Sequence, residues 1–164
     1  MKPAMQKGEL LKEKAPVHRL TSGGAHLLAG IISAIKHGYQ GNGFLPRLRE
    51  QLDILVYRLK ADIALMDQFY RRLKPTPKVQ MYSLDAKLWF LGHAFENLNE
   101  ARRSGLFSPH ERQARRLREG EQLLYRVVGD LKGKEFEWVR QTDKNLFHRL
   151  VGDSAYAYRA LRLM

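Results

Sequence analysis

Apolar residues recur every three or four positions along most of the chain, which is the spacing of amphipathic helices. This periodicity predicts helices over residues 25–38, 46–73, 84–104 and 108–132, with a last helix after a cap at Thr142 and Asp143. In the longest of them the apolar stripe contains Leu48, Leu52, Leu55, Leu59, Ile63, Met66, Phe69 and Leu73. Such a stripe packs either inside the monomer or against a second copy, and the pattern does not decide between the two.

Residues 78–83 interrupt this helical pattern. Pro75 and Pro77 end the preceding helix because neither donates a backbone hydrogen bond, and polar and apolar residues then alternate. Period-two alternation predicts a short strand with one buried face, and the alternative is an extended linker between two helices. The face opposite Val79 and Met81 carries Lys78, Gln80 and Tyr82.

A single strand leaves its backbone hydrogen-bonding groups unpaired along both edges. The simplest partner is the same strand of a second copy, in an antiparallel ribbon around a twofold axis. Such a ribbon fits the major groove of B-DNA, where lysine reads guanine and glutamine reads adenine. We therefore expect a homodimer in which the base-reading residues are Lys78, Gln80 and Tyr82.

The helix expected at 108–132 has the clearest start in the chain. Ser108 fits the N-cap, Pro109 fits the first turn, and Glu111 completes a capping box. The positive end of this helix attracts a phosphate. The expected phosphate-contacting residues are Ser108, His110, Arg112, Arg115 and Arg116. The alternative is a solvated helix face on which these arginines and Arg118 pair with Glu119 and Glu121.

The charge balance of the chain points in the same direction. Among 164 residues, Lys and Arg number 29 and Asp and Glu number 17, which gives a net charge of +12. This exceeds the roughly 2–8 charges that solubility requires, and duplex DNA is the densest common polyanion. An anionic membrane surface is the minor alternative.

Several classes of protein are disfavoured. The absence of cysteine excludes disulfides, thiolate metal sites and cysteine nucleophiles. No apolar run approaches the roughly 18 residues of a membrane span, and residues 1–16 lack the apolar region of a secretory signal. Catalytic and nucleotide-binding fingerprints are missing, and His93 with Glu96 is interpreted as a helical surface pair. We expect a cytoplasmic protein without enzymatic activity, cofactor or membrane partner.

Two family resemblances follow from these runs. The order of strand, helix, glycine turn and capped helix over residues 78–131 resembles ribbon-helix-helix DNA-binding proteins. The match departs from that family in its longer first helix and in Phe107, where a small polar residue is usual. Residues 100–107 and 138–143 are similar to the AcaB-type regulators of conjugative plasmids and integrative conjugative elements. This resemblance implies an activator of conjugative-transfer genes with a ribbon-helix-helix core extended by extra helices. RNA polymerase is a further candidate partner.

The resulting prediction is a mainly α protein with a ribbon-helix-helix core and additional N- and C-terminal helices. Its expected segments are a basic tail at 1–23, N-terminal helices at 24–74, the DNA-binding core at 75–132 and a helical extension at 133–164. The expected function is sequence-specific binding of double-stranded DNA as a homodimeric transcriptional regulator. The alternatives are a helical adaptor with a basic surface and, below it, an RNA-binding protein.

Overall fold

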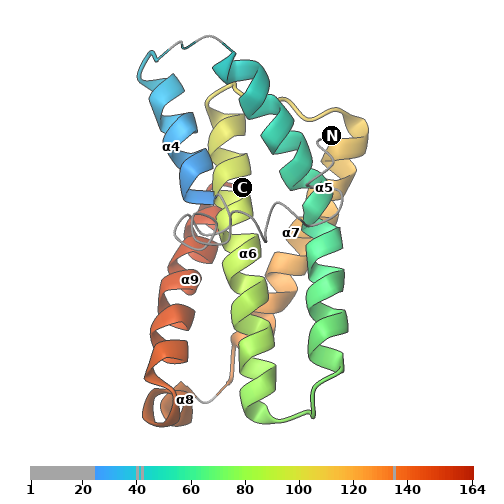
Figure 1. The fold of residues 1–164 in the computed structure, drawn as a ribbon, viewed down its shortest axis with the longest axis vertical. Coiled ribbons are helices and arrows are strands. Elements are labelled where there is room, and N and C mark those ends of the chain that lie inside the picture. The colour runs from blue at the N-terminus through green and yellow to red at the C-terminus, as the bar shows by residue number, and fades with distance from the viewer. Residues whose placement is uncertain (1–24, 40, 42, 135) are drawn as a thin grey trace.

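Helices make up nearly all of the part of the chain that this computed structural model describes, which is residues 25–39, 41, 43–134 and 136–164. The tail predicted for residues 1–23 lies outside these ranges. In chain order the helices are α4 (Ala25–Lys36), α5 (Phe44–Arg71), α6 (Pro77–Arg103), α7 (Glu111–Leu131), α8 (Phe136–Thr142) and α9 (Lys144–Arg162) (Figure 1). The long amphipathic patterns in the sequence therefore did predict helices, with ends displaced by up to three residues except at the start of α6, which lies seven residues before the predicted one.

The strand predicted for residues 78–83 is wrong, because these residues lie in the first turns of α6. Thr76 is the N-cap of this helix, and its hydroxyl accepts a hydrogen bond from the amide of Val79 at 3.2 Å. Pro77 occupies the first helical position, where a missing amide hydrogen costs nothing. The ribbon-helix-helix fold class is therefore also wrong, since no described residue forms a strand.

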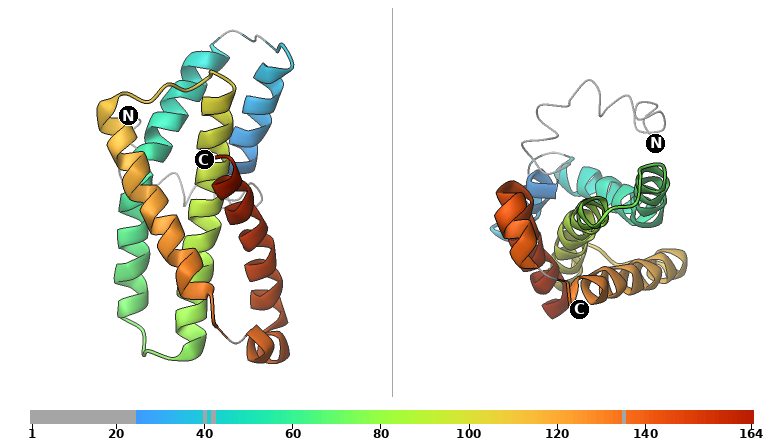
Figure 2. Two further views of the ribbon diagram at one scale, coloured as in Figure 1. Left: turned by 180° about the vertical axis from the view of Figure 1, so that it is seen from behind. Right: turned by 90° about the horizontal axis from the view of Figure 1, so that it is seen from below.

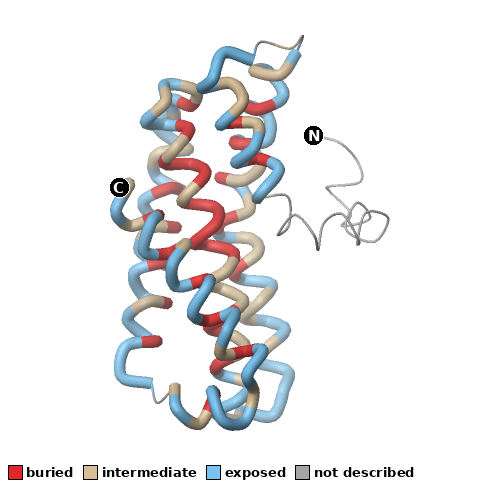
Figure 3. The backbone as a smooth tube through the Cα atoms, turned by 90° about the vertical axis from the view of Figure 1, so that its left-hand side faces the viewer, coloured by how far each residue is buried: buried red, intermediate tan, exposed pale blue. Residues whose placement is uncertain are grey.

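The central element of the bundle is α6, around which α4, α5, α7 and α9 pack (Figures 1 and 2). Its middle is buried on nearly every side, which is the pattern of a helix inside a core. Figure 3 shows buried residues concentrated along this axis, with exposed residues on the outer helices. The largest completely enclosed side chains of α6 are Leu88, Leu91, Phe95 and Leu98.

A glycine allows α7 to approach this axis closely. A Cβ atom added at Gly120 would lie 2.9 Å from Cζ of Phe95 and 3.0 Å from Cδ1 of Leu59. A glycine in mid-helix is conformationally unfavourable, but here its missing side chain leaves room for residues of α5 and α6. The position therefore serves packing at the junction of α5, α6 and α7.

The last helix begins where the sequence predicted. The carboxylate of Asp143, the N-cap of α9, accepts a hydrogen bond from the amide of Leu146 at 3.1 Å. The helix then runs alongside α6 and forms the most extensive helix–helix interface of the described structure. No helix in the described ranges combines the length and the apolar character needed to cross a bilayer.

Candidate nucleic-acid interface

The start of α7 differs from the prediction by two residues. Its N-cap is His110, whose imidazole Nδ1 accepts from the amide of Gln113 at 3.4 Å. In return, Oε1 of Gln113 accepts from the amide of His110 at 2.9 Å, which completes a capping box. The predicted box of Ser108 and Glu111 is wrong, and Ser108 lies exposed in the turn before the helix. His110 therefore already satisfies the backbone amide of Gln113, which is one of the terminal donors of α7.

Five arginines lie on α7 without an acidic partner. Four are exposed and Arg116 is half-buried. Within the described part of the chain, none has a carboxylate oxygen within the 4.0 Å of an ion pair. The five residues are Arg112, Arg115, Arg116, Arg118 and Arg126. We call them the α7 arginine face.

The two glutamates in the middle of α7 form contacts with other helices. Glu119 pairs with Lys60 of α5 at 3.5 Å, and Glu121 lies 4.0 Å from Arg102 of α6. The alternative in which these two glutamates pair with the arginines of their own helix is therefore not realised in this structure. The positive charge of the α7 arginine face remains available to an external anion.

Helix α5 supports this face from the side. The side-chain amide of Gln113 donates through Nε2 to the carboxylate of Asp53, and one turn further on the guanidinium of Arg116 lies 5.3 Å from the ring centroid of Tyr57. These contacts advance together along both helices, so α5 and α7 run side by side in the same direction (Figure 1). The cation–π contact holds Arg116 in place while leaving its charge intact.

The predicted base-reading residues do not share a surface. Tyr82 donates a hydrogen bond to Asp143 at 2.7 Å, and the ammonium group of Lys78 lies 3.2 Å from the same carboxylate. The hydroxyl of Tyr82, the amide of Leu146 and Lys78 together lower the pKa of Asp143 to about 2. Lys78 and Tyr82 thus fasten the start of α6 to the junction of α8 and α9.

Gln80 lies on a different side of α6. It lines a groove of about 450 Å³ between the end of α5, the start of α6 and the end of α7. Asp130 and Lys134 line the same groove. The ribbon face on which Lys78, Gln80 and Tyr82 were predicted to lie together does not exist, and nothing in this arrangement assigns them to base recognition.

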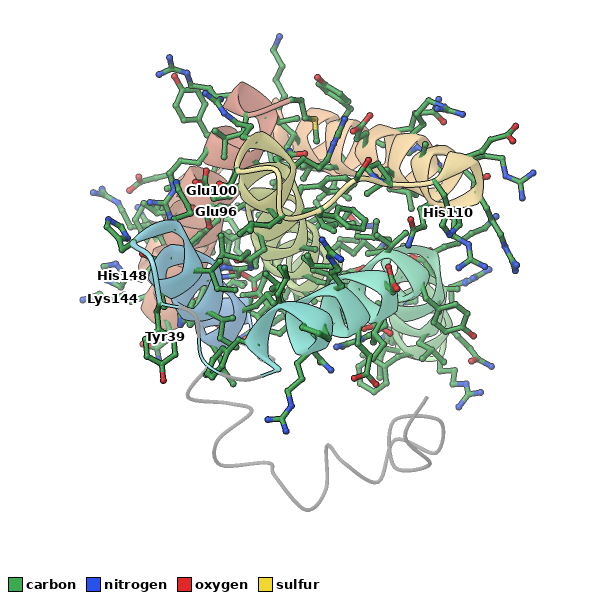
Figure 4. All side chains as sticks on the ribbon, turned by 90° about the horizontal axis from the view of Figure 1, so that it is seen from above. Tyr39, Glu96, Glu100, His110, Lys144 and His148 are labelled. Carbon is green, nitrogen blue, oxygen red and sulfur yellow. The ribbon has the colours of Figure 1, made fainter. Side chains whose placement is uncertain are left out.

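The structure also contains a polar cluster that the sequence did not predict. His93 is only 4% exposed, and its ring centroid lies 3.8 Å from that of Tyr156 and 5.1 Å from that of His26. Burial, with His26 and Arg159 nearby, lowers the pKa of His93 to about 4 and keeps it neutral. The predicted surface pair with Glu96 is therefore wrong. In Figure 4, Glu96 lies on the side of α6 that faces α4 and α9, away from His110.

A second buried cluster joins α6 to α9. Asp85 is 3% exposed and forms an ion pair with Arg149 through Oδ2, while its Oδ1 has no hydrogen-bond partner. Burial and the charge of Asp85 raise the pKa of Asp153 to about 7. No spacing rule reveals either cluster, because their members are brought together only by the packing of distant helices. Among the described residues, no three side chains are arranged to hold a metal ion.

Comparison with known proteins gives no relative. No protein-family model matches the chain, and neither a curated protein nor a solved structure matches it significantly. The interpretation of the α7 arginine face therefore depends on its own geometry and charge.

Proposed function

We propose that this chain is a cytoplasmic protein that binds double-stranded DNA, and that the α7 arginine face contacts the phosphate backbone. The observation that carries the proposal is the presence of five arginines without carboxylate partners on one solvent-facing helix. Guanidinium groups bind phosphates through two parallel hydrogen bonds, and neutralising phosphates releases condensed counterions. The net charge of +12 adds long-range attraction.

The length of the face suits a duplex. Arg112 and Arg126 are fourteen residues apart, which corresponds to about 21 Å along a helix axis. One strand of B-DNA presents about six phosphates over that distance. Contacts of this kind fix the position of the protein on DNA and carry no sequence information themselves. The proposal therefore assigns backbone binding to α7 and assigns base recognition to no residue.

A regulatory role is part of the proposal on other grounds. The resemblance of residues 100–107 and 138–143 to AcaB-type regulators supports transcriptional activation of conjugative-transfer genes. We propose RNA polymerase as a candidate partner of such an activator. The ribbon that this family implies has no place in the fold. In this proposal, α7 binds the DNA that such a regulator requires, and no ribbon is needed.

The salt dependence of DNA affinity tests the face directly. We would measure binding of a 30-base-pair duplex by fluorescence anisotropy across a salt series, comparing wild type with the double variant Arg112→Gln/Arg115→Gln. Each lost phosphate contact reduces the slope of log K against log salt by about 0.9, so we expect a reduction of about 1.8. The matched control is Arg140→Gln/Arg162→Gln, which removes the same charge from exposed positions of α8 and α9.

The control separates a local contact from a general charge effect. An equal change of slope in both double variants would show that α7 is not the contact surface, and the proposal would then be wrong. Tighter binding of single-stranded DNA or of RNA of the same length would contradict the duplex as the preferred ligand. Circular dichroism of both variants establishes that the helices are intact.

A further inference from the structure

The outward side of α5 carries an exposed surface without charge, in a chain that is otherwise strongly basic. Three large side chains stand out: Tyr57 is 51% exposed, Leu65 is 63% exposed and Phe69 is 57% exposed. Between Tyr57 and Leu65 lies the small residue Ala61. The surface, which we call the α5 outer face, consists of Ile54, Tyr57, Ala61, Ala64, Leu65, Gln68 and Phe69.

The charged residues of α5 between these positions are engaged at its edges. Arg58 pairs with Asp62 at 2.7 Å, Lys60 pairs with Glu119 of α7, and Asp67 pairs with Lys87 of α6. Between Tyr57 and Phe69, α5 therefore carries no cation without an ion-pair partner, and Arg116 of α7 approaches the face at the ring of Tyr57. Contiguous exposed apolar surfaces are typical of protein–protein contacts. A protein that binds the α5 outer face is expected to present an uncharged surface to it.

The two ends of the face carry opposite charges in symmetric positions. Glu50 lies eleven residues before Ala61, and Arg72 lies eleven residues after it. Both side chains are exposed, and neither has an ion-pair partner among the described residues. Eleven residues are close to three helical turns, so both ends point to the same side of α5 as Ala61. A helix with this arrangement is complementary to its own antiparallel copy.

We propose that the α5 outer face binds a second copy of this chain, with two antiparallel α5 helices crossing at Ala61. In this arrangement Glu50 of each copy meets Arg72 of the other, and Tyr57 packs against Leu65 of the other. The small side chain of Ala61 on the twofold axis permits close approach of the two helices. Such an interface is isologous, because the same surface serves both subunits.

The symmetry has a consequence for the α7 arginine face. When two antiparallel helices pack face to face, their twofold axis lies in the interface plane and is perpendicular to both. An element on one side of the first helix is then repeated on the same side of the second. Because α7 lies beside α5, a dimer built on the α5 outer face places both α7 arginine faces on one side. The dimer interface itself does not depend on DNA binding.

Charge exchange gives a specific test. By analytical ultracentrifugation without DNA, wild type is expected to sediment as a dimer. Glu50→Arg or Arg72→Glu alone, each of which affects two pairs per dimer, is expected to weaken dimerisation about tenfold. The double variant Glu50→Arg/Arg72→Glu restores the pairs with reversed polarity and is expected to return to within about twofold of wild type. Additive weakening in the double variant would overturn the antiparallel arrangement.

A covalent test does not depend on disrupting the interface. The chain has no cysteine, so Ala61→Cys introduces a single thiol that meets its own copy on the twofold axis. A short bismaleimide linker is expected to convert this variant to covalent dimer at least tenfold faster than Ala155→Cys, an exposed alanine on α9. Equal rates in the two variants, or a monomeric wild type at every concentration, would show that the α5 outer face does not bind a second copy.

Discussion

Gly92 and Ala157 bring the backbones of α6 and α9 into direct contact. A Cβ atom added at Gly92 would lie 2.9 Å from the amide nitrogen and 3.3 Å from the Cα of Ala157. The neighbouring atoms belong to the backbone of a packed helix, so they cannot rotate away as the end of a flexible side chain would. The missing side chain at Gly92 therefore sets the spacing of the most extensive helix pair in the described structure.

Replacing this glycine by alanine is expected to destabilise the fold despite the better helix propensity of alanine. Gly92→Ala should lower the free energy of unfolding by about 2 kcal/mol, because overpacking a close helix contact costs more than the roughly 1 kcal/mol that propensity contributes. Urea denaturation followed by circular dichroism measures the change. Gly152→Ala in α9 is the control, since a Cβ there meets nothing within 4 Å, and we expect it to be stabilising. Equal effects at both positions would contradict the close contact.

The hydrogen bond between Tyr82 and Asp143 is expected to stabilise the fold to an extent that depends on pH. The pKa of Asp143 is lowered in the folded protein to about 2 from its ordinary 3.8. The ionised carboxylate therefore adds to the free energy of unfolding above about pH 3.8, and this stabilisation is lost as the pH falls towards 2. Tyr82→Phe removes the first cause of this shift. Relative to wild type, the variant should unfold at a lower temperature near neutral pH, and the difference should shrink steadily below about pH 4.

The same variant distinguishes a structural role from DNA recognition. Tyr158→Phe, at an exposed tyrosine near the end of α9, is the control and should leave the unfolding temperature unchanged. DNA affinity of Tyr82→Phe and of Gln80→Ala, measured well below the unfolding temperature, should equal that of wild type. A loss of DNA affinity in either folded variant would restore these residues as DNA contacts.

The helix found at residues 78–83, in place of the predicted strand, has a physical explanation. The alternation of polar and apolar residues from Lys78 onward fits a strand, but Met81 equally begins the three-and-four spacing that continues through Leu84 and Leu88. Thr76 followed by Pro77 is a strong helix start, because threonine caps the helix and proline fits its first position. Over six residues the two periodicities are indistinguishable, so the cap was the decisive local signal.

The arginines of α7 were predictable, and the buried clusters were not. Arg112, Arg115 and Arg116 follow one another on an amphipathic helix, so their exposure follows from the periodicity of that helix alone. Asp85 and Arg149 are 64 residues apart and meet only when α6 packs against α9. Sequence spacing reports which face of a helix a residue occupies, whereas the partner across an interface is determined by the tertiary arrangement.

His93 and Asp153, one in each buried cluster, are expected to change the free energy of unfolding with pH in opposite directions. The pKa of His93 is about 4 in the folded protein, below its ordinary 6.5, so between these values the unfolded chain holds a proton that the folded chain lacks. Acidification therefore favours unfolding through His93. The pKa of Asp153 is about 7 in the folded protein, above its ordinary 3.8, so over its own range the folded chain holds the extra proton. A rise in pH therefore favours unfolding through Asp153.

Single substitutions should expose each contribution separately. In the range where both groups act, from about pH 4 to 6.5, each changes the free energy of unfolding by up to about 1.4 kcal/mol per pH unit, with opposite signs. Asp153→Asn should make stability rise more steeply with pH than in wild type, and His93→Gln should make it rise less steeply or fall. The groups around them, His26, Arg159, Asp85 and Arg149, remain in both variants, so the differences from wild type isolate the two residues. Urea unfolding at half-unit pH steps provides the slopes, and parallel curves for all three proteins would show that neither group is protonated differently in the folded and unfolded chain.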